Sequence, residues 1–83
     1  MAHRPHAVRM YSRSTCHLCD DARAAVLQVA ARAAFEFDEV LVDGDDELER
    51  RYGLRVPVVL VDGVEAFEYT VDPGRLYALV ARG

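Results

Sequence analysis

The stretch that decides the fold runs from Val8 to Cys19 and reads Val8-Arg9-Met10-Tyr11-Ser12-Arg13-Ser14-Thr15-Cys16-His17-Leu18-Cys19. Its first third is a short, mostly apolar run typical of a strand, and its middle is a polar loop rich in residues that cap helices. From the cysteines to about Arg32, apolar residues recur with a helical period. A strand therefore leads into a helix at two cysteines that are separated by two residues.

The position of this cysteine pair suggests a chemical role. The thiolate is the reactive form of cysteine, and the unpaired backbone N–H groups at a helix start stabilise a negative charge. Cys16 stands at that start, and Cys19 lies one turn further on, within reach for a small disulfide. We expect Cys16 to be the attacking sulfur and Cys19 the resolving one. Thr15 and His17 flank Cys16 and are candidates for tuning it, although His17 is equally well interpreted as an exposed side chain of the first turn.

Two other interpretations of the pair stay open. Structural zinc requires four ligands, and one cysteine pair supplies only two. Because His17 lies between the cysteines, and His3 and His6 lie in an expected tail, we predict no metal site. The cysteines could also be two inert core thiols. Dithiol exchange is preferred, because the pair occurs where a strand meets a helix.

The rest of the chain predicts three more strands and two more helices. Where alternation changes to a continuous apolar run in the second strand, we expect a bulge or a late start of the strand. The buried stripes are expected to hold Leu18, Ala22, Ala25, Val26 and Val29 in the first helix and Leu76, Leu79 and Val80 in the last. The predicted elements are a strand over Phe35–Val42, a short helix with Leu48 and Tyr52 that ends at Gly53, a buried central strand over Val58–Val61, a hairpin turn at Asp62-Gly63, an antiparallel strand over Val64–Tyr69, and a helix begun by Asp72-Pro73.

This order of elements predicts an α/β fold. A strand–helix–strand unit crosses over right-handed and pairs its strands in parallel, and the later hairpin adds an antiparallel edge. We therefore expect a four-stranded mixed sheet flanked by about three helices. With 83 residues, the chain has room for one domain, which we place at residues 1–83.

The composition excludes several classes of partner. The net charge is −4, all ten basic residues are arginines, and no basic run is present, so nucleic acid and anionic membranes are not expected as partners. The first residues lack the apolar stretch of a signal peptide, and no segment approaches the length of a membrane span. We expect a cytoplasmic monomer, in a compartment where structural disulfides are rare.

A second element of the site is Arg55-Val56-Pro57, which directly precedes the central strand. Proline can begin a central strand but cannot lie within one. A cis bond before Pro57 would turn the backbone of Val56 outward, where it could pair with an extended substrate.

With both elements in place, the chain resembles a glutaredoxin-like member of the thioredoxin superfamily over about Val8 to Val80. The resemblance rests on Tyr11 to Cys19, on Val56-Pro57-Val58-Val59 and on the Asp62-Gly63 hairpin; with Tyr52-Gly53 it is similar to a group of small bacterial glutaredoxin-like proteins. It implies that Cys16 is the nucleophile, that Pro57 is cis, that Val56 contacts substrate backbone and that Arg13 helps bind glutathione.

The sequence departs from the family pattern at two places. Glutaredoxins usually have Pro-Tyr between the cysteines, where this chain has His17-Leu18. They also have a Gly-Gly pair and acidic residues before the last helix, where this chain has Phe67, Glu68, Tyr69 and Thr70, with only Asp72 as a helix-start acid. Because Phe67 adds bulk and Glu68 adds negative charge if it faces the site, we expect weak glutathione binding.

We therefore expect a thiol–disulfide oxidoreductase that exchanges a Cys16–Cys19 dithiol with protein or small-molecule disulfides. No cofactor is expected, and glutathione is possible only as a co-substrate. The reductant would be a thiol, either glutathione or a reductase. The alternative is a non-catalytic module of the same fold that senses redox state or carries a metal.

Overall fold

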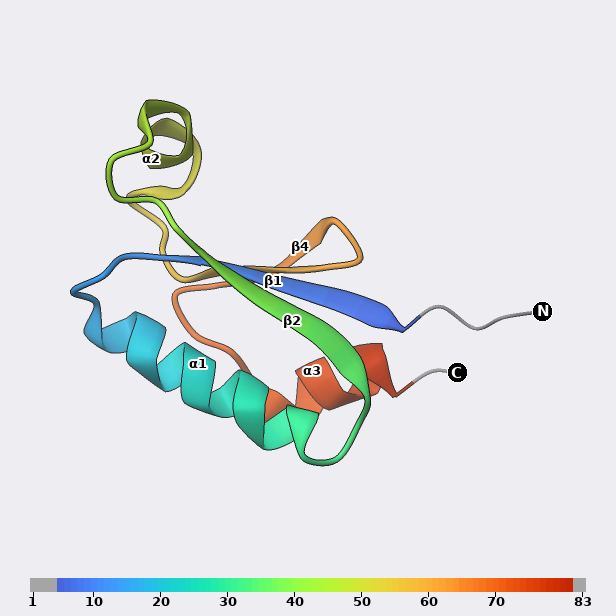
Figure 1. The fold of residues 1–83 in the computed structure, drawn as a ribbon. Helices are drawn as coiled ribbons and strands as arrows, with labels where there is room; N and C mark the ends of the chain where they lie inside the picture. The colour runs from blue at the N-terminus through green and yellow to red at the C-terminus, as the bar shows by residue number, and fades with distance from the viewer. Residues whose placement is uncertain (1–4, 82–83) are drawn as a thin grey trace.

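A four-stranded sheet in the order β2-β1-β3-β4 organises the computed structural model, which describes residues 5–81 (Figure 1). Strands β1 and β2 pair in parallel, whereas β3 runs antiparallel to both β1 and β4. The elements in chain order are β1 (His6–Ser12), α1 (His17–Ala30), β2 (Phe35–Leu41), α2 (Asp46–Tyr52), β3 (Val58–Val61), β4 (Val64–Glu68) and α3 (Pro73–Val80). The predicted fold class, a mixed sheet with three helices, is confirmed.

The larger part of the core lies between the sheet and the two helices α1 and α3, which share one side of it (Figure 1). Val8 and Met10 of β1 pack there against Val26 of α1 and Leu76 of α3. A smaller cluster lies on the opposite face, where the Tyr52 ring of α2 stacks on Tyr11 with centroids 4.1 Å apart. Both faces of the inner strands are thus covered, which explains their apolar runs.

The expectation of a bulge or a late start in the second strand is wrong, since β2 begins at Phe35. The register between β1 and β2 is unbroken from Phe35 to Leu41. Phe35 and Phe37 pack into the larger core, whereas Val40 and Val42 pack into the smaller one. The apolar parity changes because different faces of the strand are covered at its two ends, not because a residue is inserted.

The predicted set of buried residues is wrong at one position in α1 and at one position in α3. Leu18 is 42% exposed, and the buried residue of that turn is Cys19. Leu79 is 41% exposed, while Leu76 and Val80 are buried. In both helices the buried stripe is narrower than predicted, because each helix contacts the sheet and its neighbouring helix along one side only.

The N-terminal end differs from the expected tail. His3 lies outside the described residues, but His6 opens β1, and its Nδ1 atom lies 2.6 Å from Asp62 Oδ2. The Ala7 N–H also donates to Asp62 Oδ1 at 2.9 Å. Asp62 and Gly63 both have positive φ, as the predicted tight hairpin turn requires. No described helix has both the length and the apolar character needed to cross a membrane.

Candidate active site

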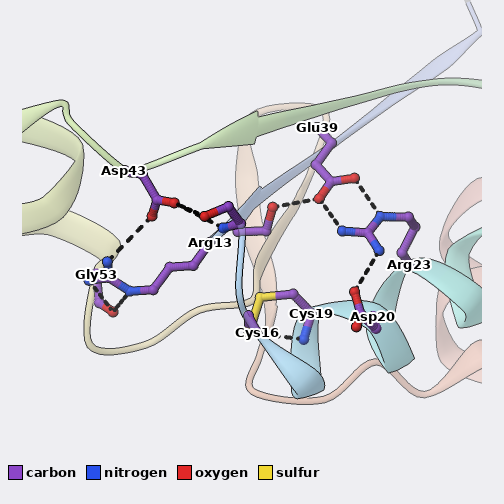
Figure 2. Close-up of a disulfide and its surroundings, with 10 residues drawn as sticks. Arg13, Cys16, Cys19, Asp20, Arg23, Glu39, Asp43 and Gly53 are labelled. Atoms are coloured by element: carbon purple, nitrogen blue, oxygen red, sulfur yellow. Dashed lines mark hydrogen bonds and ion pairs between the residues drawn. A yellow bond between two sulfur atoms is a disulfide. The ribbon is translucent and has the colours of Figure 1, made fainter.

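A disulfide joins Cys16 and Cys19 at the start of α1, with their Cα atoms 5.1 Å apart (Figure 2). Cys16 is the N-cap residue of the helix, and its Sγ atom accepts the N–H of Cys19 at 3.1 Å. Sulfur thus occupies the place where a serine or aspartate oxygen usually caps a helix. The same N–H is positioned to stabilise a thiolate on Cys16 when the disulfide opens.

The two sulfurs differ in their access to solvent. Cys19 is 0% exposed and belongs to the buried face of α1, whereas Cys16 is partly exposed. A disulfide partner from outside can therefore approach Cys16 but not Cys19. Thr15 and His17, the predicted tuning residues, are both exposed beside Cys16.

On one side of the disulfide, Arg13 is held by α2 and by the turn after β2 (Figure 2). Its Nη1 atom donates to Glu49 Oε2 at 3.1 Å, its Nη2 atom donates to Glu49 Oε1, and its Nε atom donates to the Gly53 carbonyl at 3.1 Å. Asp43 Oδ1 lies 3.5 Å from the guanidinium. Ser14, the next residue, donates its N–H to Asp43 Oδ2 at 3.0 Å. The loop that leads to Cys16 is thereby tied to α2 and its C-cap through Glu49 and Gly53, and to the turn after β2 through Asp43.

Gly53 makes this arrangement possible through its lack of a side chain. It caps α2 with an ordinary φ of −55°, so the backbone itself does not require glycine. A Cβ atom at this position would lie 2.5 Å from the Glu49 carbonyl oxygen and 2.6 Å from Arg13 Nη2. Glycine is needed here because a Cβ atom would meet both the backbone carbonyl of Glu49 and the guanidinium of Arg13.

On the other side of the disulfide, Arg23 of α1 pairs with Glu39 of β2 (Figure 2). Its Nε and Nη2 atoms donate to the two carboxylate oxygens of Glu39 at 2.7 and 2.5 Å. Glu39 also accepts the hydroxyl of fully buried Ser12 at 2.5 Å, and Arg23 binds Asp20 at 2.9 Å. The hydrogen bonds from Arg23 lower the pKa of Glu39, with Ser12 adding to the effect and burial opposing it. This network fixes the first turns of α1 against the sheet.

The segment before β3 begins at Gly53, whose carbonyl accepts the hydrogen bond from Arg13 Nε and so connects this segment to the Arg13 loop. The Val56-Pro57 bond is cis, as the resemblance implied. Pro57 is buried and accepts the N–H of Tyr69 at 2.8 Å through its carbonyl. Val56 is half-buried, and within residues 5–81 its backbone groups take part in no hydrogen bond.

Comparison with known proteins agrees with this geometry. The family described as Glutaredoxin-like domain (DUF836) matches residues 7–81. This chain belongs to the glutaredoxin-like domain family. The uncharacterized protein Rv0508 of Mycobacterium tuberculosis is 31% identical over 80 residues, which cover 90% of this chain and 82% of that protein.

Solved structures similar to this glutaredoxin-like domain include protein Ne2328 of Nitrosomonas europaea, with a TM-score of 0.80 and 28% identity over 96% of both chains. Protein XcR50 of X. campestris is 42% identical with a TM-score of 0.68, covering 86% of this chain and 91% of that one. A mutant thioredoxin from Halobacterium salinarum has a TM-score of 0.64 at 23% identity over 93% of this chain and 73% of its own, and it shows the shared thioredoxin fold.

Several residues of the site in this glutaredoxin-like domain were not predicted from the sequence. The residues around Arg13, which are Asp43, Glu49 and Gly53, lie far along the chain, and only the cap position of Gly53 carried a sequence signal. The structure also places Phe67 against the core and pairs Glu68 with Arg55 at 3.1 Å. Phe67 is therefore partly buried rather than fully exposed, and the negative charge of Glu68 is balanced by Arg55. Within residues 5–81, no cluster of three His, Cys, Asp or Glu side chains is placed to hold a metal ion.

Proposed function

We propose that this glutaredoxin-like domain is a dithiol–disulfide oxidoreductase that works through Cys16 and Cys19. The observation that carries the proposal is the unequal exposure of two cysteines joined at a helix start. A partly exposed Cys16 can attack a substrate, and a buried Cys19 one turn away can resolve the product. Because Cys19 is shielded, external disulfides meet only one sulfur.

The proposed reaction runs in two exchange steps. The Cys16 thiolate attacks one sulfur of a substrate disulfide, so that a mixed disulfide forms and the other substrate sulfur leaves as a thiolate. Cys19 then loses its proton and attacks Cys16 Sγ, which releases the second substrate thiolate and forms the Cys16–Cys19 disulfide. Two electrons pass to the substrate, and the two protons of the dithiol end on the two product thiols. An external thiol or reductase returns the domain to the dithiol by the reverse exchange.

Val56 and Pro57 are proposed to hold the substrate during the first step. The backbone groups of Val56 make no hydrogen bond within the described part of the chain and could pair with an extended peptide. Protein disulfides are therefore the proposed main substrates. Small-molecule disulfides would react without using this backbone edge.

Glutathione is proposed to be a weak co-substrate. The resemblance gives Arg13 the task of binding a glutathione carboxylate, but the donors of Arg13 already bind Glu49 and Gly53. Asp72 caps α3 by accepting the N–H of Gly74 at 2.9 Å, so its carboxylate has a structural role as well. Glutathione would have to displace these internal partners in order to bind in the family's manner.

The test of this function is turnover of bis(2-hydroxyethyl) disulfide with a thiol reductant by the wild type, Cys16→Ser and Cys19→Ser. We expect turnover by the wild type, none by Cys16→Ser and at most partial turnover by Cys19→Ser. Reversible formation of the disulfide without turnover of any disulfide substrate would instead support the non-catalytic redox-sensing module.

A further inference from the structure

Tyr69 has a backbone conformation that does not suit its side chain. It follows β4 directly and has a φ of +69°. The Thr70 N–H donates to the Glu68 carbonyl at 2.8 Å, so residues 68–70 form a tight three-residue turn with Tyr69 at its centre. A γ-turn with positive φ is rare and strained, and a bulky residue in this region is an outlier. The other described residues with positive φ are Gly44, Asp62 and Gly63, which are types that tolerate it.

Packing does not account for the choice of tyrosine. The residue is 46% exposed and belongs to neither core cluster. Within residues 5–81, its ring stacks on no other aromatic ring or guanidinium, and its hydroxyl makes no hydrogen bond. Strained backbone conformations of this kind cluster at active sites and ligand-binding segments. A strained turn that holds a half-exposed tyrosine therefore points to a role outside the core.

The turn lies next to the substrate edge of the proposed reaction. The Tyr69 N–H donates to the Pro57 carbonyl at 2.8 Å, which joins the turn to the residue that follows Val56. The chain between β4 and α3 then passes beside the first turn of α1, which carries the disulfide (Figures 1 and 2). The backbone of Tyr69 is thus hydrogen-bonded to the Val56-Pro57 segment that is proposed to hold the substrate.

Two exposed leucines lie on these segments, together with the exposed polar residues Thr15, His17 and Thr70. Leu18, between the two cysteines, is 42% exposed, and Leu54, three residues before Pro57, is 92% exposed. Arg55 binds Glu65 at 2.9 Å as well as Glu68 at 3.1 Å. The disulfide turn and the segment before β3 therefore offer one exposed leucine each and a free backbone edge at Val56, while Arg13 and Arg55 are already paired with carboxylates.

We propose that Tyr69 is a specificity-determining residue that packs against the chain flanking a substrate cystine, so that the site selects protein disulfides with apolar neighbours. The inference rests on the proposed exchange function. Glutathione disulfide has four carboxylates, two ammonium groups and no apolar side chain, so it gains little from Tyr69 or the leucines. A leucine or phenylalanine beside a substrate cysteine would bury surface against the tyrosine ring.

The experiment compares wild type with Tyr69→Gly, which removes the ring and suits the turn, and Tyr69→Phe, which keeps the ring. Each is assayed with a Leu-Cys-Leu peptide disulfide, the matched Ser-Cys-Ser disulfide, glutathione disulfide and bis(2-hydroxyethyl) disulfide. For Tyr69→Gly we expect a loss of about fivefold to tenfold in kcat/KM on the leucine peptide, through a higher KM, and no change on the other three substrates. Tyr69→Phe should behave like the wild type.

Two further measurements keep the inference separate from the proposed function. Tyr69→Gly should unfold at a higher urea concentration than the wild type, because the strain is relieved. A Leu-Ser-Leu peptide without cysteine should bind oxidised wild type more tightly than oxidised Tyr69→Gly in an NMR titration, whether or not any disulfide is turned over. Equal losses on all four substrates, or equal peptide binding by both proteins, would overturn the role of Tyr69. Absence of turnover of bis(2-hydroxyethyl) disulfide by the wild type would overturn the exchange function alone.

Discussion

Replacing Glu39 by glutamine tests how the disulfide-bearing turn is fixed to the sheet. The substitution keeps the size and shape of the side chain but removes the charge that binds Arg23. It also turns one of the two carboxylate acceptors into an N–H donor that faces the guanidinium. The Ser12 hydroxyl retains an acceptor only if the amide is oriented toward it. We therefore expect a loss of stability without a change of fold.

The size of the effect follows from the contacts. Arg23 donates to both oxygens of Glu39 at 2.7 and 2.5 Å, and a hydrogen bond to a charged group contributes about 1.5–3 kcal/mol net. The side chains of Arg23 and Glu39 are still 34% and 21% exposed, so solvent screening reduces the sum. We expect a loss of about 2 kcal/mol in the free energy of unfolding, which corresponds to roughly 8–16 °C in Tm for a domain of this size.

The loss should also depend on pH. The pKa of Glu39 is lowered in the folded protein, chiefly by the hydrogen bonds from Arg23. A carboxyl group of this kind adds stability that is present above its unfolded-state pKa of about 4.3 and is lost as the pH falls through its folded-state pKa. The difference between wild type and Glu39→Gln should therefore be full at pH 7 and shrink below about pH 4.

Urea unfolding of the oxidised protein, followed by far-UV circular dichroism at pH 7 and at lower pH, measures both effects. Glu36→Gln is the matched control, because Glu36 is an exposed carboxylate on the same strand. Equal midpoints for Glu39→Gln and Glu36→Gln at pH 7 would refute the reasoning. A difference that stays constant down to the acid limit would refute the assignment of the charge to Glu39.

Two further predictions concern the two sides of the disulfide. In the reduced protein at limiting iodoacetamide, Cys16 should be alkylated before Cys19, because Cys19 is fully buried. Peptide mapping by mass spectrometry measures the alkylated fraction of each cysteine. Earlier alkylation of Cys19 would reverse the assigned roles. Gly53→Ala should lower stability by about 1–3 kcal/mol, because its Cβ would lie 2.5 Å from the Glu49 carbonyl oxygen and 2.6 Å from Arg13 Nη2. Gly74→Ala has its nearest such contact at 3.4 Å and should have a smaller effect. Equal urea midpoints for the two alanine variants would show that the end of α2 and the Arg13 side chain can adjust at little cost.

Much of the fold could be predicted because its signals are local. The helix start at the cysteines, the Asp62-Gly63 hairpin and the Asp72-Pro73 cap each depend on neighbouring residues, and the structure has all three. Which side chain of a helix turn is buried depends on tertiary packing as well as on local sequence. Periodicity places Leu18 on the buried face of the first helix, whereas in the structure Cys19 is buried and Leu18 is exposed.

The groups around the site could not be predicted in the same way. The partner of Arg13 is Glu49, 36 residues away, and the partner of Arg23 is Glu39, on a strand that only the fold brings alongside. Many acidic residues of the sequence could have filled either place. The turn at Tyr69 could not be predicted for a different reason. Tyrosine is common in strands, so the sequence pattern extends the strand through Tyr69 instead of placing a turn with positive φ there.

Trapping of a mixed disulfide by Cys19→Ser tests whether Cys16 is the nucleophile and Cys19 the resolving cysteine. The reduced variant is mixed with the Leu-Cys-Leu peptide disulfide, quenched with acid and analysed by intact-mass and peptide mass spectrometry. We expect a stable adduct with one half of the peptide disulfide on Cys16, and release of that half by the wild type as its Cys16–Cys19 disulfide forms. An adduct that fails to form on Cys16, or that forms equally fast on Cys19 in Cys16→Ser, would contradict these roles.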